Sequence, residues 1–231
     1  MRRLKNIVFA LLALLLLAHY GVATAYVVSP YPTHKTLLVW GDSLSAAYGI
    51  PVEKGWVNLL REKLGADYQV INGSISGETT IGGLTRLPEA LRLHQPDYLL
   101  LELGANDGLR GLPTINMQEN LEKMIQLAQK AQAKPVLIGI RLPPNYGMTY
   151  TEKFEQVYRD LAEQYQLPFI PFLLEGVAQD FKLMQADGLH PVAEAQPIVL
   201  EHVWATLEDV LKPAVPLAPV NAAEASAGAQ E

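Results

Sequence analysis

The middle of the chain alternates between short apolar runs and longer segments with helical periodicity. The short runs lack strict polar alternation, which is typical of strands buried on both faces. They are residues 37–40, 68–71, 98–103, 136–140 and 167–172. Hydrophobic residues recur at intervals of three and four in the segments between and after them. These predicted helices are residues 56–64, 80–94, 121–128, 154–165 and 199–210.

Strands that alternate with helices favour a parallel sheet, because each parallel connection needs a crossover segment. Right-handed crossovers then place helices on both faces of the sheet. The pattern therefore predicts an α/β fold, a three-layer α/β/α sandwich with a mostly parallel five-stranded sheet. In such a sheet ligands bind beyond the carboxyl ends of the strands.

The two ends of the chain differ from this pattern. Residues 1–25 combine three early basic residues, an apolar run and the small residues Ala23-Thr24-Ala25, which predicts a secretory signal peptide. An uncleaved membrane anchor is the alternative, although the apolar run is short for a span of about 20 residues. We expect an extended lead-in over residues 26–35, one domain over 36–212 and a disordered tail over 213–231.

Composition narrows the chemistry. The 231-residue chain has a formal net charge of −6 and no clustered basic run, which argues against a nucleic-acid partner. It contains no cysteine, which excludes disulfides, thiolate metal sites and a cysteine nucleophile. No set of His, Asp and Glu has metal-ligand spacing, so we expect neither a metal nor another cofactor.

The loop after the first predicted strand offers a nucleophile. Its sequence is Gly41-Asp42-Ser43-Leu44-Ser45. A tight turn at Gly41 would present Ser43 at the end of the sheet, near a helix N-terminus that favours negative charge. Taken alone, the segment is more typical of a simple helix cap.

Two further loops offer groups that stabilise a developing oxyanion. Gly77, in the loop after the second strand, can bring a backbone N–H close to a ligand. Asn106 follows the third strand and could direct its amide toward the same charge. Both segments also have the composition of ordinary turns.

Asp187-Gly188-Leu189-His190-Pro191 is the most specific local signal. An Asp and a His three residues apart can hydrogen-bond, and the carboxylate then fixes the imidazole tautomer. The other imidazole nitrogen remains free to accept a proton from a serine. A surface turn before the last helix is the alternative.

Together, these segments resemble the SGNH (GDSL) hydrolase superfamily, in the branch of bacterial periplasmic thioesterase I, lysophospholipase L1 and arylesterase. The stretches that carry the resemblance are residues 41–48, 74–79, 101–111, 141–147 and 187–191. The resemblance implies a flavodoxin-like fold, with Ser43 as nucleophile, His190 as general base and Asp187 as its orienting carboxylate. It also implies an oxyanion hole made by the Ser43 and Gly77 N–H groups and the Asn106 amide.

The resemblance leaves a supporting role for three other polar residues. We expect Asp42, Asn72 and Asp107 to form a polar network behind Ser43 and Asn106. Gly73 stands where this branch usually has Ala, and Ala47 where it often has Gly. Neither difference removes a group that the reaction needs.

The implied activity is hydrolysis of small-molecule esters, thioesters or lysophospholipids through an acyl-enzyme on Ser43, by a periplasmic or secreted monomer. After signal cleavage we expect no membrane span. A carbohydrate or peptide esterase of the same superfamily is one alternative. A periplasmic binding module without turnover is the other.

Overall fold

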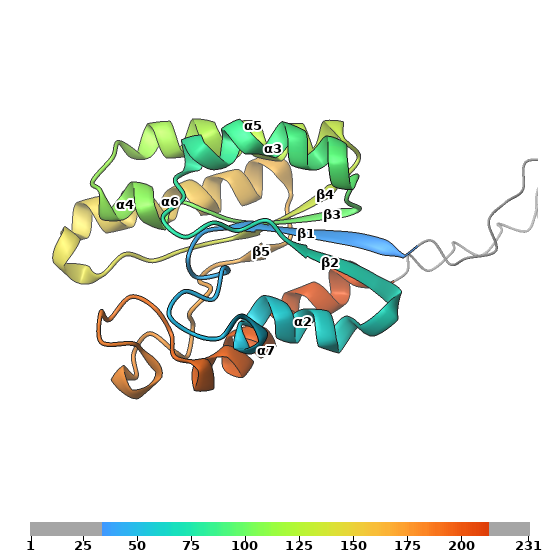
Figure 1. Cartoon of the computed structure of the whole chain (residues 1–231). Helices are drawn as coiled ribbons and strands as arrows, with labels where there is room; N and C mark the ends of the chain where they lie inside the picture. The colour runs from blue at the N-terminus through green and yellow to red at the C-terminus, as the bar shows by residue number, and fades with distance from the viewer. Residues whose placement is uncertain (1–33, 213–231) are drawn as a thin grey trace, which may run out of the picture. The chain divides into compact units, whose positions relative to one another are not determined.

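Five parallel strands form the centre of the fold (Figure 1). The computed structural model describes residues 34–212; the expected signal segment, most of the lead-in and the C-terminal tail lie outside the described residues. The strands are β1 (Lys35–Gly41), β2 (Tyr68–Asn72), β3 (Tyr98–Glu102), β4 (Lys134–Ile138) and β5 (Phe169–Ile170). Their order in the sheet is β2-β1-β3-β4-β5, and every neighbouring pair is parallel.

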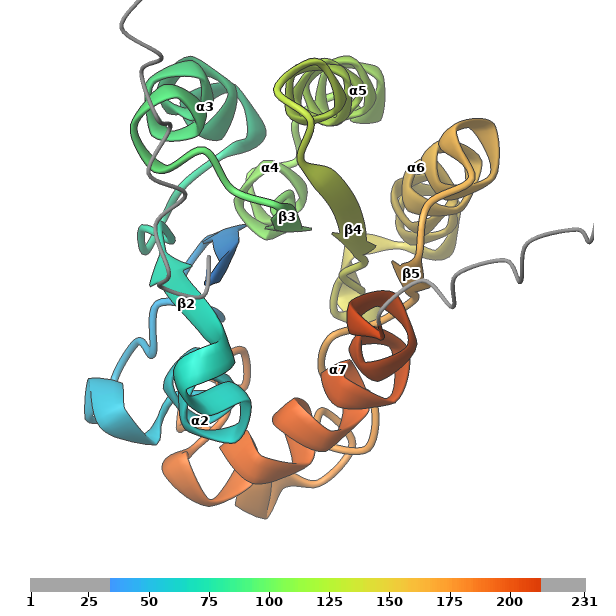
Figure 2. The same ribbon diagram turned by 90° about the vertical axis from the view of Figure 1, so that its right-hand side faces the viewer.

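Helices cover both faces of this sheet. They are α2 (Trp56–Leu64), α3 (Thr80–His94), α4 (Ala105–Leu109), α5 (Thr114–Lys130), α6 (Met148–Tyr165) and α7 (Gln196–Leu211). Short 3₁₀ turns are η1 (Val52–Lys54), η2 (Gly65–Asp67), η3 (Pro144–Tyr146), η4 (Phe181–Leu183) and η5 (Ala193–Ala195). Figure 2 shows α3, α5 and α6 on one face and α2 and α7 on the other. The predicted three-layer α/β/α sandwich is confirmed.

The two faces of β1 explain why its central residues 37–40 are all apolar. Leu37 and Val39 belong to the core beneath α2 and α7, whereas Leu38 and Trp40 belong to the core beneath α3, α5 and α6. All four side chains are buried. A strand covered on both faces has no position for a solvated side chain, which is why strict alternation is missing.

The fifth strand is short, as predicted. The sequence indicates a short strand bounded by prolines within residues 167–172, and Phe169–Ile170 pair with β4. Pro168 and Pro171 flank these two residues, and proline has no N–H with which to extend the ladder. The segment from residue 171 to 195 therefore leaves the sheet as a long connection with only short turns.

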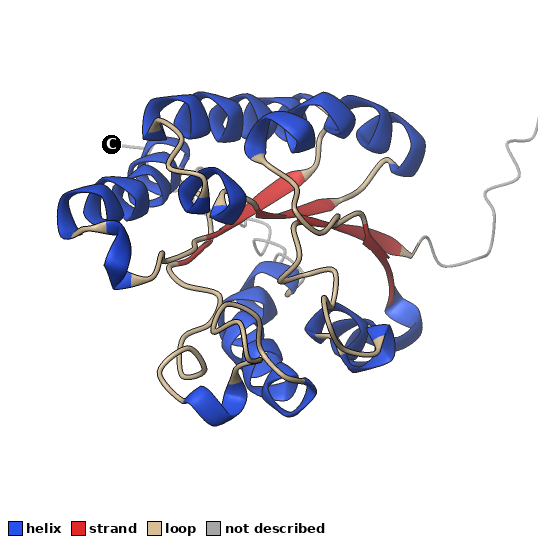
Figure 3. Ribbon diagram, turned by 60° about the vertical axis from the view of Figure 1, so that its left-hand side comes forward, coloured by secondary structure: helices blue, strands red, loops and turns tan. Residues whose placement is uncertain are grey.

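All five strands end at the same edge, so their following loops gather there (Figure 3). This carboxyl edge is where the candidate residues of the sequence lie. Among residues 34–212, no helix combines the length and the apolar character needed to cross a membrane.

Candidate active site

Ser43 lies in a tight turn directly after β1. The turn is closed by hydrogen bonds from Ala46 N–H to the Asp42 carbonyl at 2.9 Å and from Tyr48 N–H to the Ser43 carbonyl at 3.2 Å. The expectation that Ser43 stands near a helix N-terminus was wrong, because residues 42–50 form turns and bends and the next α-helix begins at Trp56. Backbone geometry, and not a helix dipole, presents this serine.

The buried carboxyl group of Glu102 lies beneath the turn. Its Oε2 accepts hydrogen bonds from Ser45 Oγ at 2.7 Å and from Asp42 N–H at 3.3 Å, so it holds the chain on both sides of Ser43. A Cβ at position 41 would lie 2.4 Å from the same oxygen, which explains why Gly41 precedes the turn. Sequence reasoning missed Glu102, which ends an otherwise apolar strand.

His190 and Asp187 lie in the long connection between β5 and α7. His190 Nε2 is 2.8 Å from Ser43 Oγ, and His190 Nδ1 is 2.7 Å from Asp187 Oδ2. An ionised carboxylate only accepts hydrogen bonds, so Nδ1 carries the proton and Nε2 is left to accept from the serine hydroxyl. Ser43, His190 and Asp187 are therefore joined by two consecutive hydrogen bonds, in which Ser43 donates to His190 and His190 donates to Asp187.

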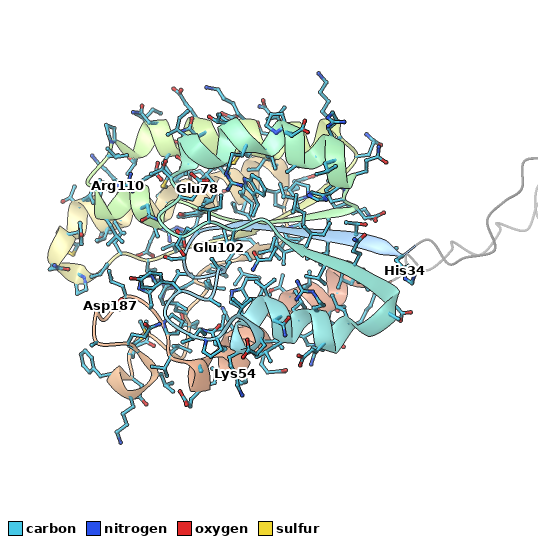
Figure 4. All side chains as sticks on the ribbon, in the orientation of Figure 1. His34, Lys54, Glu78, Glu102, Arg110 and Asp187 are labelled. Atoms are coloured by element: carbon cyan, nitrogen blue, oxygen red, sulfur yellow. The ribbon has the colours of Figure 1, made fainter. Side chains whose placement is uncertain are left out.

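Hydrogen bonds from neighbouring residues stabilise the ionised form of the Asp187 carboxylate. Partial burial raises the pKa of Asp187, but hydrogen bonds from Leu189 N–H and from the His190 ring and N–H outweigh it and hold that pKa below its usual value. The carboxylate is thus ionised at neutral pH. Figure 4 labels Asp187 at the same end of the molecule as Arg110, opposite His34.

The His190 ring is also held from its other side. The Tyr48 ring lies against it, with 4.5 Å between the ring centroids. Gln185 binds the two segments together, because its Nε2 donates to the Tyr48 carbonyl at 2.8 Å and to the Pro191 carbonyl at 3.0 Å. The loop that carries His190 is in this way fastened to the loop that carries Ser43.

Asn106 lies in the first turn of α4, a helix that the sequence pattern did not predict. Its Nδ2 donates to the Glu78 carbonyl at 3.0 Å and to Asp42 Oδ2 at 3.3 Å. Gly104, with φ of 129°, sets the direction of this turn, and a Cβ there would lie 2.3 Å from Tyr158 Oη. The Asn106 amide group therefore donates to two protein acceptors.

Two backbone N–H groups next to Asn106 remain free to bind an anion. Gly77 adopts φ of 80°, and Asn106 bonds the carbonyl of the residue that follows it. Within the described part of the chain, neither Gly77 N–H nor Ser43 N–H donates to a protein acceptor. The geometry brings Ser43, Gly77 and Asn106 to one corner of the carboxyl edge.

The three residues expected to form one polar network make separate contacts instead. Asp42 bonds Asn106, whereas Asn72 Nδ2 donates to the Ser45 carbonyl at 2.8 Å. Asp107 turns away, and its carboxylate accepts from the N–H of Thr80 at 2.8 Å and from the Thr80 hydroxyl. Asp107 thus caps the start of α3 and does not contact Asn106 or Ser43 by a side-chain hydrogen bond.

Two buried acids, Asp42 and Glu102, lie close together under the site. Burial raises the pKa of Asp42 to about 7, against the opposing effect of hydrogen bonds from Leu44 N–H and Asn106. Burial and the nearby Asp42 charge raise the pKa of Glu102 well above its usual value. Burial therefore favours the neutral form of Glu102, and Asp42 is poised to gain or lose a proton near neutral pH.

An apolar pocket of about 80 Å³ opens beside Ser43, Asn106 and His190. Its remaining walls are largely aliphatic or aromatic: Leu44, Leu109, Leu142, Phe172, Leu174 and Leu189. Arg141 also lines it, but its guanidinium is paired with Glu155 and Glu175. The pocket is therefore an apolar cavity that opens at Ser43 and His190.

The loop from Leu109 to Pro113 adjoins this pocket, which Leu109 lines, and the loop is fastened at three points. Tyr146 Oη donates to the Leu109 carbonyl at 3.1 Å, and Tyr150 Oη donates to the Leu112 carbonyl at 2.8 Å. Arg110 Nη2 donates to the Gly77 carbonyl at 3.1 Å. Tyr146 thus contacts the backbone of the loop and is not among the residues that line the pocket.

Residues 34–212 contain no cluster of three or more His, Asp or Glu residues that could hold a metal ion. The polar groups that converge on the pocket are those of a hydroxyl nucleophile with a base, together with N–H donors for an oxyanion.

Comparison with known proteins agrees with this geometry. Residues 39–196 match the model of the GDSL-like Lipase/Acylhydrolase family. Esterase TesA of Pseudomonas aeruginosa is 51% identical over 180 residues, which cover 77% of this chain and 90% of that protein. Thioesterase 1/protease 1/lysophospholipase L1 of Escherichia coli is 42% identical over 176 residues, covering 76% and 85% of the two chains.

A solved structure adds chemical information. The psychrotrophic esterase EstA from Pseudoalteromonas sp., inhibited by monoethylphosphonate, matches with a TM-score of 0.74 and 42% identity, covering 77% of this chain and 98% of that chain. The family match spans the Ser43, Gly77, Asn106 and Asp187–His190 segments together. By fold, site and sequence, the chain belongs to the GDSL-like lipase/acylhydrolase family.

Proposed function

We propose that the protein hydrolyses carboxylic esters and thioesters of acyl chains through an acyl-enzyme on Ser43. The observation that carries this proposal is the series Asp187–His190–Ser43, with heavy-atom distances of 2.7 and 2.8 Å. These are the distances at which a general base removes a proton from a hydroxyl group.

In the first half of the reaction, Ser43 Oγ attacks the substrate carbonyl and His190 Nε2 takes its proton. Asp187 stabilises the imidazolium that forms. The carbonyl oxygen becomes negative, and the N–H groups of Ser43 and Gly77 are placed to bind it. One such donor lowers the barrier by about 3 kcal/mol in related sites.

Asn106 contributes the third donor only after an exchange of partners. Its Nδ2 now donates to Asp42 and to the Glu78 carbonyl, so one of these bonds is given up when the oxyanion forms. The longer bond, to Asp42 at 3.3 Å, is the one we expect to break. The donor is thus held in position before the substrate arrives.

The second half of the reaction releases the acyl group. The leaving alcohol or thiol departs with the proton from His190. Water then gives a proton to His190 and attacks the acyl-enzyme, and collapse of the second intermediate returns the proton to Ser43 Oγ. The products are a carboxylic acid and the free alcohol or thiol, and the enzyme is regenerated.

The pocket favours acyl chains longer than the acetyl groups that a carbohydrate esterase removes. Its walls beyond Ser43 are hydrocarbon, whereas a sugar-binding site needs several polar groups for hydroxyls. We propose esters, thioesters and lysophospholipids as the substrate class. The N-terminal sequence further supports a periplasmic or secreted location. We propose that the protein acts there as a monomer.

The test is hydrolysis of p-nitrophenyl butyrate and octanoate by the wild type and by Ser43→Ala. We expect the variant to lose about 10³-fold or more in kcat. Ser76→Ala, in the exposed loop after β2, is the matched control and should retain activity. Equal rates for the wild type and Ser43→Ala would overturn the mechanism, and a preference for acetate over both longer esters would favour the carbohydrate alternative.

A further inference from the structure

The exposed hydrophobic side chains of this protein are concentrated at one end. Ten large hydrophobic residues are exposed among those described. Four of them stand in the first turns of helices that begin at the carboxyl edge: Ile81, Ile115, Met148 and Ile198. Only Leu93, in the last turn of α3, lies at the opposite edge of the sheet.

The other five stand in loops and turns of the carboxyl edge: Tyr48, Val52, Ile75, Leu112 and Phe181. Phe181 is the most exposed of all, at 89%. It is held outward by a defined turn, because Asp180 caps η4 by accepting from Lys182 N–H at 2.9 Å. Single exposed apolar residues are ordinary, but nine of ten at one edge are not. We call these nine residues the apolar rim.

The apolar rim adjoins the entrance of the pocket at three of its residues. Tyr48 lies against His190, and Ile75 is two residues before Gly77. Leu112 belongs to the loop whose Leu109 lines the pocket. Any partner that covers the rim therefore also covers the path by which substrate reaches Ser43.

Charged residues of both signs accompany the apolar ones. Asp180 and Lys182 flank Phe181, and Glu53 and Lys54 directly follow Val52. Such adjacent opposite charges complement the phosphate and ammonium groups of a zwitterionic lipid headgroup. The acidic balance of the whole chain, −6, opposes binding to an anionic surface.

We propose that the apolar rim docks on a zwitterionic lipid surface and inserts its side chains there, so that acyl lipids enter the pocket directly from that surface. This inference rests on the proposed esterase function. A protein or a second copy of the chain seated on the rim would close the pocket. A fluid lipid surface is the partner that covers the rim and supplies substrate through it.

The test compares the wild type with the triple variant Ile115→Ser, Met148→Ser, Phe181→Ser. None of these residues contacts the reacting groups. Co-sedimentation with phosphatidylcholine vesicles measures docking, and hydrolysis of lysophosphatidylcholine carried in those vesicles measures its consequence. Leu93→Ser, which removes an equally exposed leucine from the far edge, is the matched control.

We expect the triple variant to bind vesicles about tenfold or more weakly and to hydrolyse the vesicle-borne lipid correspondingly slowly. Its rate on dissolved p-nitrophenyl butyrate should match that of the wild type, as should both rates for Leu93→Ser. A triple variant that binds vesicles like the wild type, or an equal loss in Leu93→Ser, would overturn the proposal.

Two further outcomes would also overturn it. Binding that requires phosphatidylglycerol in the vesicles would contradict the zwitterionic assignment. A wild type that dimerises in sedimentation velocity while the triple variant is monomeric would assign the rim to a second copy. Failure of the esterase proposal is distinct, because it would appear as inactivity of the wild type on the dissolved ester.

Discussion

Glu102 and Ser45 are joined by a hydrogen bond of 2.7 Å in the interior, beneath the turn that carries the nucleophile candidate. The same Glu102 oxygen binds Asp42 N–H, so one carboxyl group fastens residues on both sides of Ser43. The position of the Ser43 hydroxyl thus depends on a side chain that does not reach the substrate.

Glu102→Ala should therefore impair both stability and turnover. The change leaves Ser45 Oγ and Asp42 N–H buried without an acceptor, which costs about 1–3 kcal/mol in the free energy of unfolding. Because Ser43 loses its support, kcat should fall by about tenfold or more, with a smaller change in KM. Urea unfolding and p-nitrophenyl butyrate kinetics measure the two effects.

Glu102→Gln is the informative companion variant. A glutamine oxygen can accept both hydrogen bonds, and the amide resembles the neutral acid that burial favours. We expect kcat within about threefold of the wild type at neutral pH. A Gln variant as inactive as the Ala variant would show that the carboxyl group itself, and not its position, is required.

The two buried acids predict how stability depends on pH. Burial raises the pKa of Asp42 to about 7, so the folded chain binds this proton more tightly than the unfolded chain. The resulting stabilisation is complete below the unfolded pKa of about 4 and is lost as the pH rises to about 7. Glu102, whose pKa burial also raises, contributes a loss of stability in the same direction as the pH rises.

Urea titrations at pH 5, 6, 7 and 8 test this dependence. The free energy of unfolding of the wild type should fall across the series, and Glu102→Gln should show a shallower fall. Asp187, with its lowered pKa, acts in the opposite direction only below about pH 4, outside this range. Parallel curves for the two proteins would remove Glu102 as a source of the dependence.

Asp187→Asn should reduce kcat by about 10³- to 10⁴-fold, because the amide no longer fixes the Nδ1–H tautomer of His190. KM should change little. Asp209→Asn is the control, because it makes the same substitution at a surface carboxylate that pairs with Lys212. A loss of less than tenfold in Asp187→Asn would mean that the backbone around His190 orients the ring by itself.

Asp107→Ala should act on stability more than on turnover. The carboxylate caps the start of α3 through Thr80, so its removal should lower the free energy of unfolding by about 1–2 kcal/mol. Per folded molecule, kcat should stay within about threefold of the wild type. Measuring kcat at a temperature where both proteins are fully folded separates the two effects, and a large loss of kcat there would place Asp107 in the reaction.

The tyrosine hydroxyls on the Leu109–Pro113 loop should influence chain-length preference. The double variant Tyr146→Phe, Tyr150→Phe removes two hydrogen bonds to the loop backbone, at 3.1 and 2.8 Å. A looser wall holds long acyl chains less well, so KM for p-nitrophenyl octanoate should rise about threefold or more while that for butyrate changes little. Tyr165→Phe, at the far end of α6, is the control, and an unchanged octanoate-to-butyrate ratio in the double variant would contradict the role of the loop.

Much of the fold follows from periodicity in the sequence. The segment 80–94 shows helical spacing and is helical over those residues, and β1 and β3 appear as buried apolar runs. Helix α4 has five residues and no periodic pattern, and the sequence Asn-Asp-Gly within it is typical of a turn. Only its place between β3 and α5 makes it helical.

The positions of residues that follow strand ends could be predicted from the sequence. The contacts of Asp107 and Glu102 could not, because they depend on how helices and strands pack together. Ser43, Gly77, Asn106 and His190 follow strands that share one edge, so the topology brings them together. Asp107 follows Asn106, but consecutive residues on a helix point about 100° apart, so its carboxylate reaches α3 instead. Glu102 gave no signal, because an acid at a strand end is ordinarily solvated and only the tertiary fold buries it.

The two hydrogen bonds donated by Gln185 have a consequence for inactivation by heat. His190 and Asp187 belong to a segment that contributes no strand to the sheet, and Gln185 fastens that segment to the loop of Ser43. Within this segment none of the residues from Gln185 to His190 is buried, so we expect this turn to open locally while the sheet, its helices and the buried part of the segment remain intact. Activity should then disappear on warming before the far-ultraviolet circular dichroism changes, and it should return on cooling, so that the enzyme is switched off by a local event and not by denaturation.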